Sequence, residues 1–153
     1  MKWFLLTVGA LILLGLAAII TMAVQSQKTP EHLGLNQGQL RPCPPSPNCV
    51  CSEAHTQGSE QHAVTAIKLA DRDWQTMKRV ITESGGVIQQ SNDLYLHATF
   101  TTPVFRYVDD VELRLDEVSG LIHIRSASRV GRSDFGVNRK RVMQLSNNPV
   151  STL

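Results

Sequence analysis

The sequence lacks a strong net charge: 15 lysines and arginines against 13 aspartates and glutamates leave a formal charge of +2. So small a charge gives no general attraction to nucleic acid, and we expect no nucleic-acid partner. Several catalytic motifs are also missing from the chain. It has no Ser-His-Asp order, no His-Glu zinc motif, no glycine-rich phosphate loop and no paired catalytic carboxylates. The sequence therefore gives little support to an enzyme, and it predicts no cofactor and no metal.

Charged residues are absent from the 22 residues between Trp3 and Val24. That length matches the about 20 residues that an α-helix needs to cross a bilayer, so residues 1–24 are interpreted as a membrane anchor, with residues 3–24 in the lipid. The alternative is a secreted protein, released by cleavage of a signal peptide near Ala23, although the apolar region of such a peptide is usually only ~7 to 15 residues long. No cysteine lies near the end of the run, which excludes a lipid-modified cysteine there.

The side of the membrane can be inferred from flanking charges and from cysteine use. Lys2 precedes the apolar run and Lys28 is the next cation, a weak bias that keeps the N-terminus in the cytoplasm. The domain would then be periplasmic or otherwise extracytoplasmic. Cys43, Cys49 and Cys51 agree with an oxidising compartment, and the simplest arithmetic is one disulfide and one spare thiol.

Residues 25–61 are rich in Gln, Ser, Pro, His and Gly and lack apolar periodicity, which predicts a tether followed by an irregular loop. Prolines crowd just before Cys49, so we expect a stiff extended loop that a bridge from Cys43 to Cys49 could close. The three cysteines could instead form a metal or redox site with His55. Their spacing is not one of the standard zinc patterns, so the disulfide is favoured.

Residues 62–147 are predicted to form one α+β domain, followed by a tail over residues 148–153. Trp74, Met77 and Ile81 share a face at helical spacing, whereas most other segments alternate as strands do. Hairpin-length links in the order β-α-β-β-β-β-α predict an antiparallel sheet of about five strands with two helices on one face. The predicted strands are residues 62–69, 87–90, 93–101, 105–116 and 121–129, and the predicted helices are residues 71–84 and 136–145.

The pairing of the last two strands follows from their apolar pattern. A slip of one residue would exchange the two faces of the hairpin, and only a four-residue turn at residues 117–120 puts the aliphatic side chains together. On the charged face the pairing is interpreted as an exposed ion pair, worth about 0 to 1 kcal/mol. The predicted neighbours are Leu115 with Ile122, Leu113 with Ile124, Glu112 with Arg125, and Asp110 diagonally with Arg129.

Asp109 is the residue whose predicted position is costly, because this register points it toward the apolar layer. A structural role is favoured, with hydrogen bonds to Ser128 or to backbone amides before the last helix. The alternative is a hydrolase or transferase in which Asp109 or Asp110, beside Glu112, acts as general base.

A block of motifs is formed by Tyr107–Glu112, Ile124–Arg141, Cys43-Pro44 and Ser46–Val50. It is similar to the domain-of-unknown-function family numbered 1499, over roughly residues 40–146. This resemblance implies a bacterial envelope or plastid protein, often with an N-terminal export or anchor segment, and no established activity. In such proteins the position of Cys51 is usually Ser, which implies that Cys51 is the spare thiol and that Cys43 pairs with Cys49.

The segment from Ile124 to Arg141 contains six basic residues and one acidic residue. Ser133 or Asp134 can cap the final helix, whose free amides would lie close to the preceding strand and form an anion pocket. Arginine binds carboxylate and phosphate through two parallel hydrogen bonds, so the expected partner is an anionic small molecule or envelope protein. The predicted ligand-binding residues are Arg125, Ser126, Ser128, Arg129, Arg132, Ser133, Asn138 and Arg139.

Two other interpretations of the arginines remain open. Arg125 and Arg129 could be engaged in ion pairs with Glu112 and Asp110, while the arginines of the last helix are solvated or touch lipid headgroups. The domain could also be a structural subunit of a membrane complex. The leading hypothesis is a membrane-anchored envelope binding or accessory domain.

Overall fold

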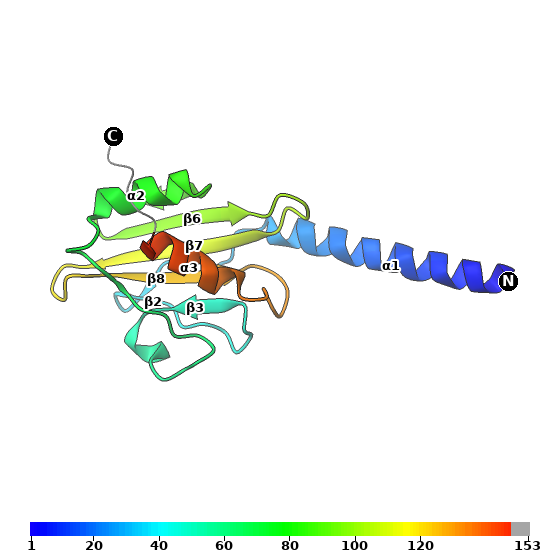
Figure 1. The fold of residues 1–153 in the computed structure, drawn as a ribbon, viewed down its shortest axis with the longest axis horizontal. Helices are drawn as coiled ribbons and strands as arrows, with labels where there is room; N and C mark the ends of the chain where they lie inside the picture. Colours follow the sequence, from blue (N-terminus) through cyan, green and yellow to red (C-terminus); the bar gives the residue numbers. More distant parts are fainter. Residues whose placement is uncertain (148–153) are drawn as a thin grey trace.

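The computed structural model describes residues 1–147, so the predicted tail over residues 148–153 lies outside the described part of the chain. Helix α1, Lys2–Ser26, projects away from the rest of the molecule (Figure 1). Within residues 1–147 it is the one helix long and apolar enough to cross a membrane. By length and composition it fits a single-pass anchor or a signal sequence.

The domain is built on a six-stranded sheet with the order β3-β8-β7-β6-β5, and the short β4 also pairs with β8. All of these pairings are antiparallel. The predicted α+β class is therefore confirmed, with one strand more than expected. The strands are β3 Cys49–Cys51, β4 Ile67–Lys68, β5 Val87–Ser91, β6 Tyr95–Thr101, β7 Val108–Asp116 and β8 Leu121–Ser128.

Helices α2, Trp74–Glu83, and α3, Val137–Asn147, pack on one face of the sheet (Figure 1). Helix α2 begins where the side chain of Asp73 accepts a hydrogen bond from the amide of Thr76, and it ends before Gly85, whose φ of 87° suits glycine. Both helices bury apolar side chains against the sheet. The largest fully buried members of this core include Met77, Ile81, Leu96, Leu113, Ile122, Ile124 and Leu145.

The register predicted for the last hairpin is confirmed along its whole length. Leu115 pairs with Ile122 and Leu113 pairs with Ile124, and these aliphatic residues face the helices. The register could be predicted because burying one apolar face excludes a slip of one residue.

Ordered structure begins earlier than residue 62, where the sequence had placed its start. A hairpin of β1, Leu35–Asn36, and β2, Gln39–Leu40, precedes β3 and the 3-10 turn Ala54–Thr56. These elements are too short to show an alternation, and all three residues of β3 are buried. Conversely, the predicted strand 62–69 is wrong in length, because only β4 pairs with β8.

The second face of the sheet carries the charges, and it is covered by the segment that follows α1. The amide of Gly34 donates to Glu112 Oε1 over 2.7 Å, and Leu40, with 1% of its surface exposed, packs near Tyr95. Glu112 and Arg125 are therefore buried, at 0% and 3% exposed, and the expectation of an exposed ion pair was wrong. We call the side chains on this face the charged layer. Its members are Glu53, Tyr95, His97, Asp110, Glu112, Arg114, His123, Arg125 and Arg129.

Candidate functional site

The first group of the charged layer surrounds Asp110. Arg129 donates to both of its carboxylate oxygens, over 2.9 and 2.8 Å, and His97 Nε2 lies 2.8 Å from Oδ1. Burial by itself raises the pKa of Asp110, but the hydrogen bonds from His97 and Arg129 outweigh it and hold the pKa below its usual range. Asp110 is thus a weaker base than an ordinary aspartate.

The second group surrounds Glu112. Its Oε2 accepts from Arg125 Nη1 over 2.9 Å, and its Oε1 accepts from the hydroxyl of Tyr95 over 2.7 Å as well as from Gly34. Burial, followed by the neighbouring carboxylate, raises the pKa of Tyr95 far above its usual range, so the phenol stays protonated as a donor. The predicted pairing of Glu112 with Arg125 is confirmed.

The third group surrounds Glu53, a residue that sequence reasoning missed. Arg114 donates to both of its oxygens, over 2.8 and 3.1 Å, and His123 Nδ1 lies 3.4 Å away. Burial raises the pKa of Glu53, yet the hydrogen bonds from Arg114 and from the amide of Leu40 lower it below its usual range. No sequence signal pointed to Glu53, because it follows a short strand and pairs with a residue 61 positions away.

A cleft of about 340 Å³ lies between the segment after α1 and the charged layer. We call it the segment cleft. On the side of the sheet it is lined by Arg125, Ser128 and Arg129, three of the predicted ligand-binding residues, together with Asp110 and Ala127. The other lining residues belong to the end of α1, the segment after it and the disulfide loop: Gln25, Lys28, Thr29, Pro30, Glu31, His32, Leu33 and Pro44.

The two arginines of the segment cleft differ in how far their donors are used. Arg129 donates from Nε and Nη2 to Asp110, and from Nη1 to the carbonyl oxygens of Ser26 and Gln27 over 3.2 and 3.4 Å. Arg125 donates from Nη1 to Glu112, whereas its Nε is buried without a hydrogen-bond partner among residues 1–147. Arg125 is thus the arginine in the cleft with unused hydrogen-bonding capacity.

The remaining predicted ligand residues do not line this cleft. Asn138 is fully buried and joins the hydroxyls of Ser126 and Ser128 to the carbonyl of Asn48. Arg139 donates to three carbonyls of residues 60–63. Arg132 and Ser133 are exposed in the loop before α3.

The predicted anion pocket at the start of α3 is occupied by the protein itself. Asp134 accepts from the amide of Asn138 over 2.6 Å and from that of Gly136 over 3.0 Å, as the predicted cap requires. These amides therefore already have an acceptor.

Asp109 faces the helices, as its register predicted, but its partner is Arg141 rather than Ser128. Arg141 Nη2 donates to Asp109 Oδ2 over 2.7 Å, and the same guanidinium lies 4.8 Å from the ring centroid of Phe100. An ion pair with an arginine is therefore formed by each of Asp109, Asp110 and Glu112. This arrangement does not favour any of the three as a general base.

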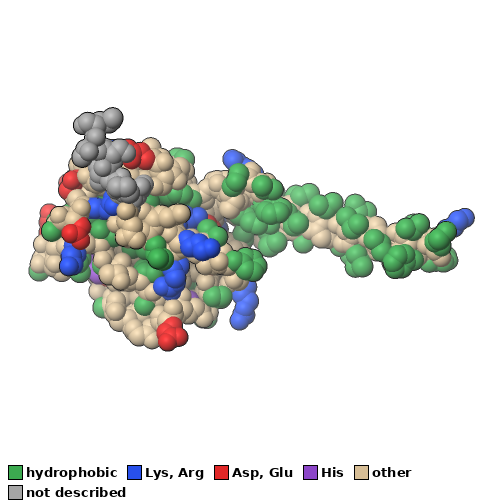
Figure 2. All heavy atoms as spheres, in the orientation of Figure 1, with side chains coloured by type: hydrophobic (Ala, Val, Ile, Leu, Met, Phe, Trp, Pro, Cys, Tyr) green, Lys and Arg blue, Asp and Glu red, His purple; other side chains and the backbone are tan. Residues whose placement is uncertain are grey.

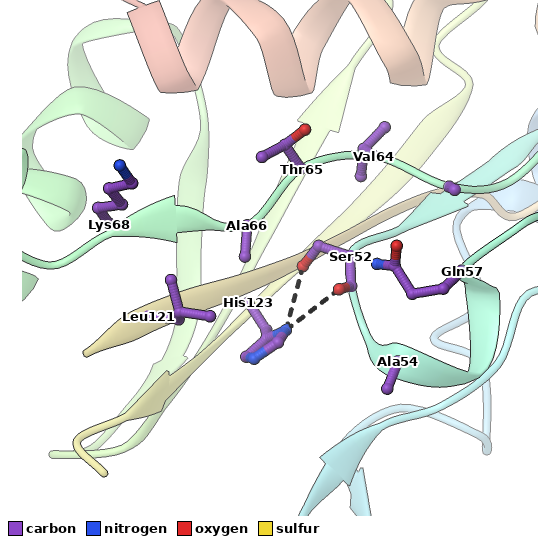
Figure 3. Close-up of a pocket in the computed structure, with 10 residues that line it drawn as sticks. Ser52, Ala54, Gln57, Val64, Thr65, Ala66, Lys68, Leu121 and His123 are labelled. Atoms are coloured by element: carbon purple, nitrogen blue, oxygen red, sulfur yellow. Dashed lines mark hydrogen bonds between the residues drawn. The ribbon is translucent and has the colours of Figure 1, made fainter. Parts of the chain in front are cut away.

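A cavity of about 500 Å³ lies beside Ser52, Lys68 and His123 (Figure 3). The hydroxyl of Ser52 lies 3.4 Å from His123 Nδ1, and Glu53 Oε2 lies 3.4 Å from the same nitrogen. In a Ser-His-carboxylate catalytic triad, the serine and the carboxylate bind opposite nitrogens of the histidine ring. Ser52 also accepts from the amide of Ile124 over 2.8 Å, so this cluster secures β8 rather than forming a catalytic triad.

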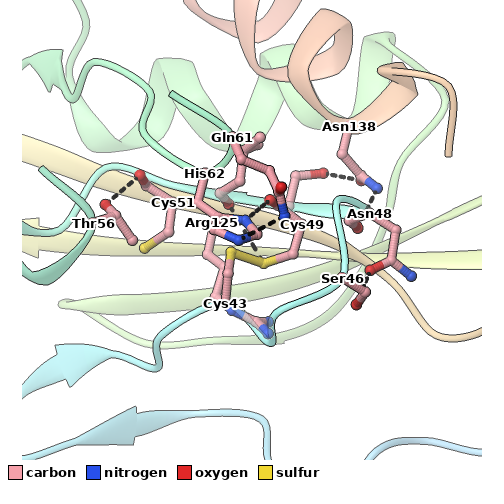
Figure 4. Close-up of a disulfide and its surroundings, with 12 residues drawn as sticks. Cys43, Ser46, Asn48, Cys49, Cys51, Thr56, Gln61, His62, Arg125 and Asn138 are labelled. Carbon is pink, nitrogen blue, oxygen red and sulfur yellow. Dashed lines mark hydrogen bonds between the residues drawn. A yellow bond between two sulfur atoms is a disulfide. The ribbon is translucent and has the colours of Figure 1, made fainter. Parts of the chain in front are cut away.

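The disulfide joins Cys43 to Cys49, as expected, and Arg125 lies next to it (Figure 4). Cys51 is the free thiol, and it is fully buried. Burial raises the pKa of Cys51 to about 11. A transient link between molecules through Cys51 would therefore require the sheet edge to open.

Comparison with known proteins gives one family. The family model described as "Protein of unknown function (DUF1499)" matches residues 39–148. No curated protein and no solved structure matches the chain. The matched range contains β2, the disulfide loop and the whole charged layer.

Proposed function

The chain belongs to the DUF1499 family of proteins of unknown function, and from this premise we propose that it is a membrane-anchored envelope domain that binds an anionic ligand in the segment cleft. The observation that carries the proposal is the unpartnered, buried Nε of Arg125. A buried donor without a partner costs about 1–3 kcal/mol, which a ligand oxygen would recover once the Arg125 side chain turns this nitrogen toward the cleft. A carboxylate or phosphate oxygen is the acceptor that an arginine favours.

Other groups of the cleft support an anion. Lys28 and His32 are exposed and line the cleft together with Arg125. Asp110 does not oppose an anion strongly, because Arg129 neutralises it through two hydrogen bonds. The ligand is therefore held by Arg125 at the floor and by Lys28 and His32 at the mouth, while Arg129 shapes the wall.

The proposal places the domain outside the cytoplasm. Disulfides persist in oxidising compartments, and the bridge between Cys43 and Cys49 supports that location. In the proposed function α1 also stays attached as an anchor, because Met22, Gln25 and Ser26 take part in cavities or contacts of the domain.

The experiment compares potassium phosphate with potassium chloride at equal ionic strength, using the full chain in mild detergent. A ligand that binds only the folded state raises its stability, so phosphate should raise the Tm of the transition followed by tryptophan fluorescence, to which Trp74 contributes within the domain. Two variants should lose this rise. The first is Lys28→Gln with His32→Gln, and the second is Glu112→Gln with Arg125→Met.

The second variant removes both members of a buried ion pair, because removing one alone would leave an uncompensated charge. The amide oxygen of the new glutamine can still accept from Tyr95 and Gly34. Lys140→Gln is the matched control, because Lys140 is exposed on α3 outside the cleft. An equal rise in Tm for all variants would show that phosphate acts as a general salt, and the proposal would fail.

A further inference from the structure

The end of the domain next to α1 is fixed to that helix. Ser26 is fully buried, Gln27 Nε2 donates to the carbonyl of Arg106 over 2.7 Å, and Arg129 Nη1 reaches the carbonyl of Ser26. Two loops meet the helix here: residues 102–107, between β6 and β7, and residues 129–136, between β8 and α3. We call α1's last turns and these two loops the helix-side end.

The helix-side end contains a cavity of about 360 Å³. It lies on the Asp109 face of the sheet, so it is separate from the segment cleft, and Ser128 is the residue that lines both. The rings of Phe105 and Tyr107 stack in its wall, with centroids 5.6 Å apart. The apolar lining consists of Met22, Phe105, Tyr107, Val130, Phe135 and Val137.

Apolar side chains around this cavity are exposed to a degree that is unfavourable in water. Val104 is 77% exposed, Phe105 48%, Phe135 91% and Val137 43%. Clustered apolar surface of this kind marks a binding surface rather than ordinary scatter. Figure 2 shows hydrophobic side chains continuing from α1 to the adjoining end of the domain.

The length of α1 indicates at what level of the membrane the cavity lies. From Trp3 to Val24 the uncharged stretch has 22 residues, which at about 1.5 Å per residue is roughly the 30 Å thickness of a bilayer's hydrocarbon. Met22 is two residues from the end of this stretch. The cavity that Met22 lines therefore lies at the boundary between acyl chains and headgroups.

Charges around the helix-side end suit lipid headgroups. Lys28, Arg106 and Arg132 are exposed there or in the adjoining segment. The two carboxylates that line the cavity are already engaged: Asp109 holds Arg141, and Asp134 caps α3. Exposed cations beside exposed aromatic residues are the usual composition of a membrane-contacting surface.

We propose that this cavity holds an acyl chain of a phospholipid from the leaflet at the C-terminal end of α1. The chain enters between the loops that carry Phe105 and Phe135, and it lies against Met22. The lipid phosphate stays at the level of Lys28, Arg106 and Arg132. This site requires α1 to remain attached, and it does not depend on anion binding in the segment cleft.

The test uses the full chain in vesicles of equal amounts of phosphatidylcholine and phosphatidylglycerol. A trace of phosphatidylcholine carries a photoactivatable diazirine, either at the end of one acyl chain or on the headgroup. We expect the acyl probe to crosslink to residues 102–107 and 130–137 as well as to α1, which serves as internal standard in every sample.

Phe105→Ser with Phe135→Ser should reduce acyl crosslinking of the two loops about tenfold relative to α1. Both side chains are exposed, so the fold should persist, which circular dichroism can check. Val118→Ser is the matched control, because Val118 is fully exposed in the turn between β7 and β8, at the opposite end of the domain.

Two results would overturn the inference. Acyl crosslinks confined to α1 would show that no chain enters the cavity. Labelling of the loops by the headgroup probe alone would show that the domain rests on the membrane surface without taking up a chain. Neither result bears on phosphate binding, which is measured separately in detergent.

Discussion

Arg129 joins Asp110 to the end of helix α1. Its Nε and Nη2 hold both oxygens of Asp110, and its Nη1 donates to the carbonyl oxygen of Ser26. The side chain of Arg129 is 6% exposed, so this connection is shielded from water. One guanidinium thereby ties β8, β7 and α1 together.

Replacing Arg129 by Met should destabilise the domain strongly. It would leave Asp110 buried with His97 as its remaining side-chain partner, and breaking a buried ion pair on one side costs about 3–5 kcal/mol. The measurement is denaturant unfolding of the full chain in detergent, followed by tryptophan fluorescence. Arg132→Gln, at an exposed site, should change the free energy of unfolding by no more than about 0.5 kcal/mol. A loss that small for Arg129→Met would contradict the structural role.

The double replacement Asp110→Asn with Arg129→Met should be more stable than Arg129→Met alone. It removes the uncompensated carboxylate, and the coupling between the two positions is read from the thermodynamic cycle. Additive effects would mean that the two side chains do not interact in solution.

Stability should fall in acid through Asp110. Its pKa is held below the usual value of 3.8, because hydrogen bonds from His97 and Arg129 outweigh the opposing effect of burial. A carboxyl with a lowered pKa in the folded state stabilises the fold above its unfolded pKa, and this contribution is lost as the pH falls through the folded pKa. Unfolding free energies below about pH 4 should therefore drop more steeply for the native chain than for Asp110→Asn. Parallel curves would remove Asp110 as the cause.

Cys51 should not react with thiol reagents while the protein is folded. It is fully buried, and its pKa is raised to about 11, so almost no thiolate exists at pH 8. Labelling with a chromogenic disulfide reagent should give one thiol per chain after denaturation and almost none before. Peptide mapping without reduction should identify Cys43 linked to Cys49. Rapid native labelling, or any linkage that includes Cys51, would contradict the structure.

Replacing Asp134 by Ala should cost about 0.5–2 kcal/mol, the usual range for loss of a helix N-cap. The amides of Gly136 and Asn138 would lose their acceptor at the start of α3. Ser133→Ala is a milder control, because its hydroxyl accepts from a single exposed amide, that of Phe135. Equal losses of stability for the two variants would argue against Asp134 as the cap.

Much of the fold could be predicted from local pattern. The register of β7 and β8 followed from the alternation of aliphatic residues, because burying one face excludes a slip. Helix α2 was evident from the spacing of Trp74, Met77 and Ile81. The pairing of Glu112 with Arg125 followed from the register itself, without knowledge of any other strand.

The charged layer could not be fully predicted, because its burial depends on a segment distant in sequence. Nothing local indicates that Gly34 donates to a carboxylate 78 positions away, or that Glu53 meets Arg114. The arginines near the C-terminal end illustrate the same limit. Composition showed an excess of positive charge there, but only tertiary contacts assign Arg129 to Asp110, Arg141 to Asp109 and Arg139 to backbone carbonyls.

The sequence by itself determined the apolar helix, the strand register and the candidate disulfide loop, since each depends on the order of nearby side chains and on elementary sterics and burial. The tertiary structure alone decided which charges are buried, which arginine of the segment cleft keeps an unused donor, and that Met22 meets Phe105 and Phe135 in one cavity. These features depend on long-range packing, which brings together residues whose separation along the chain carries no periodic signal.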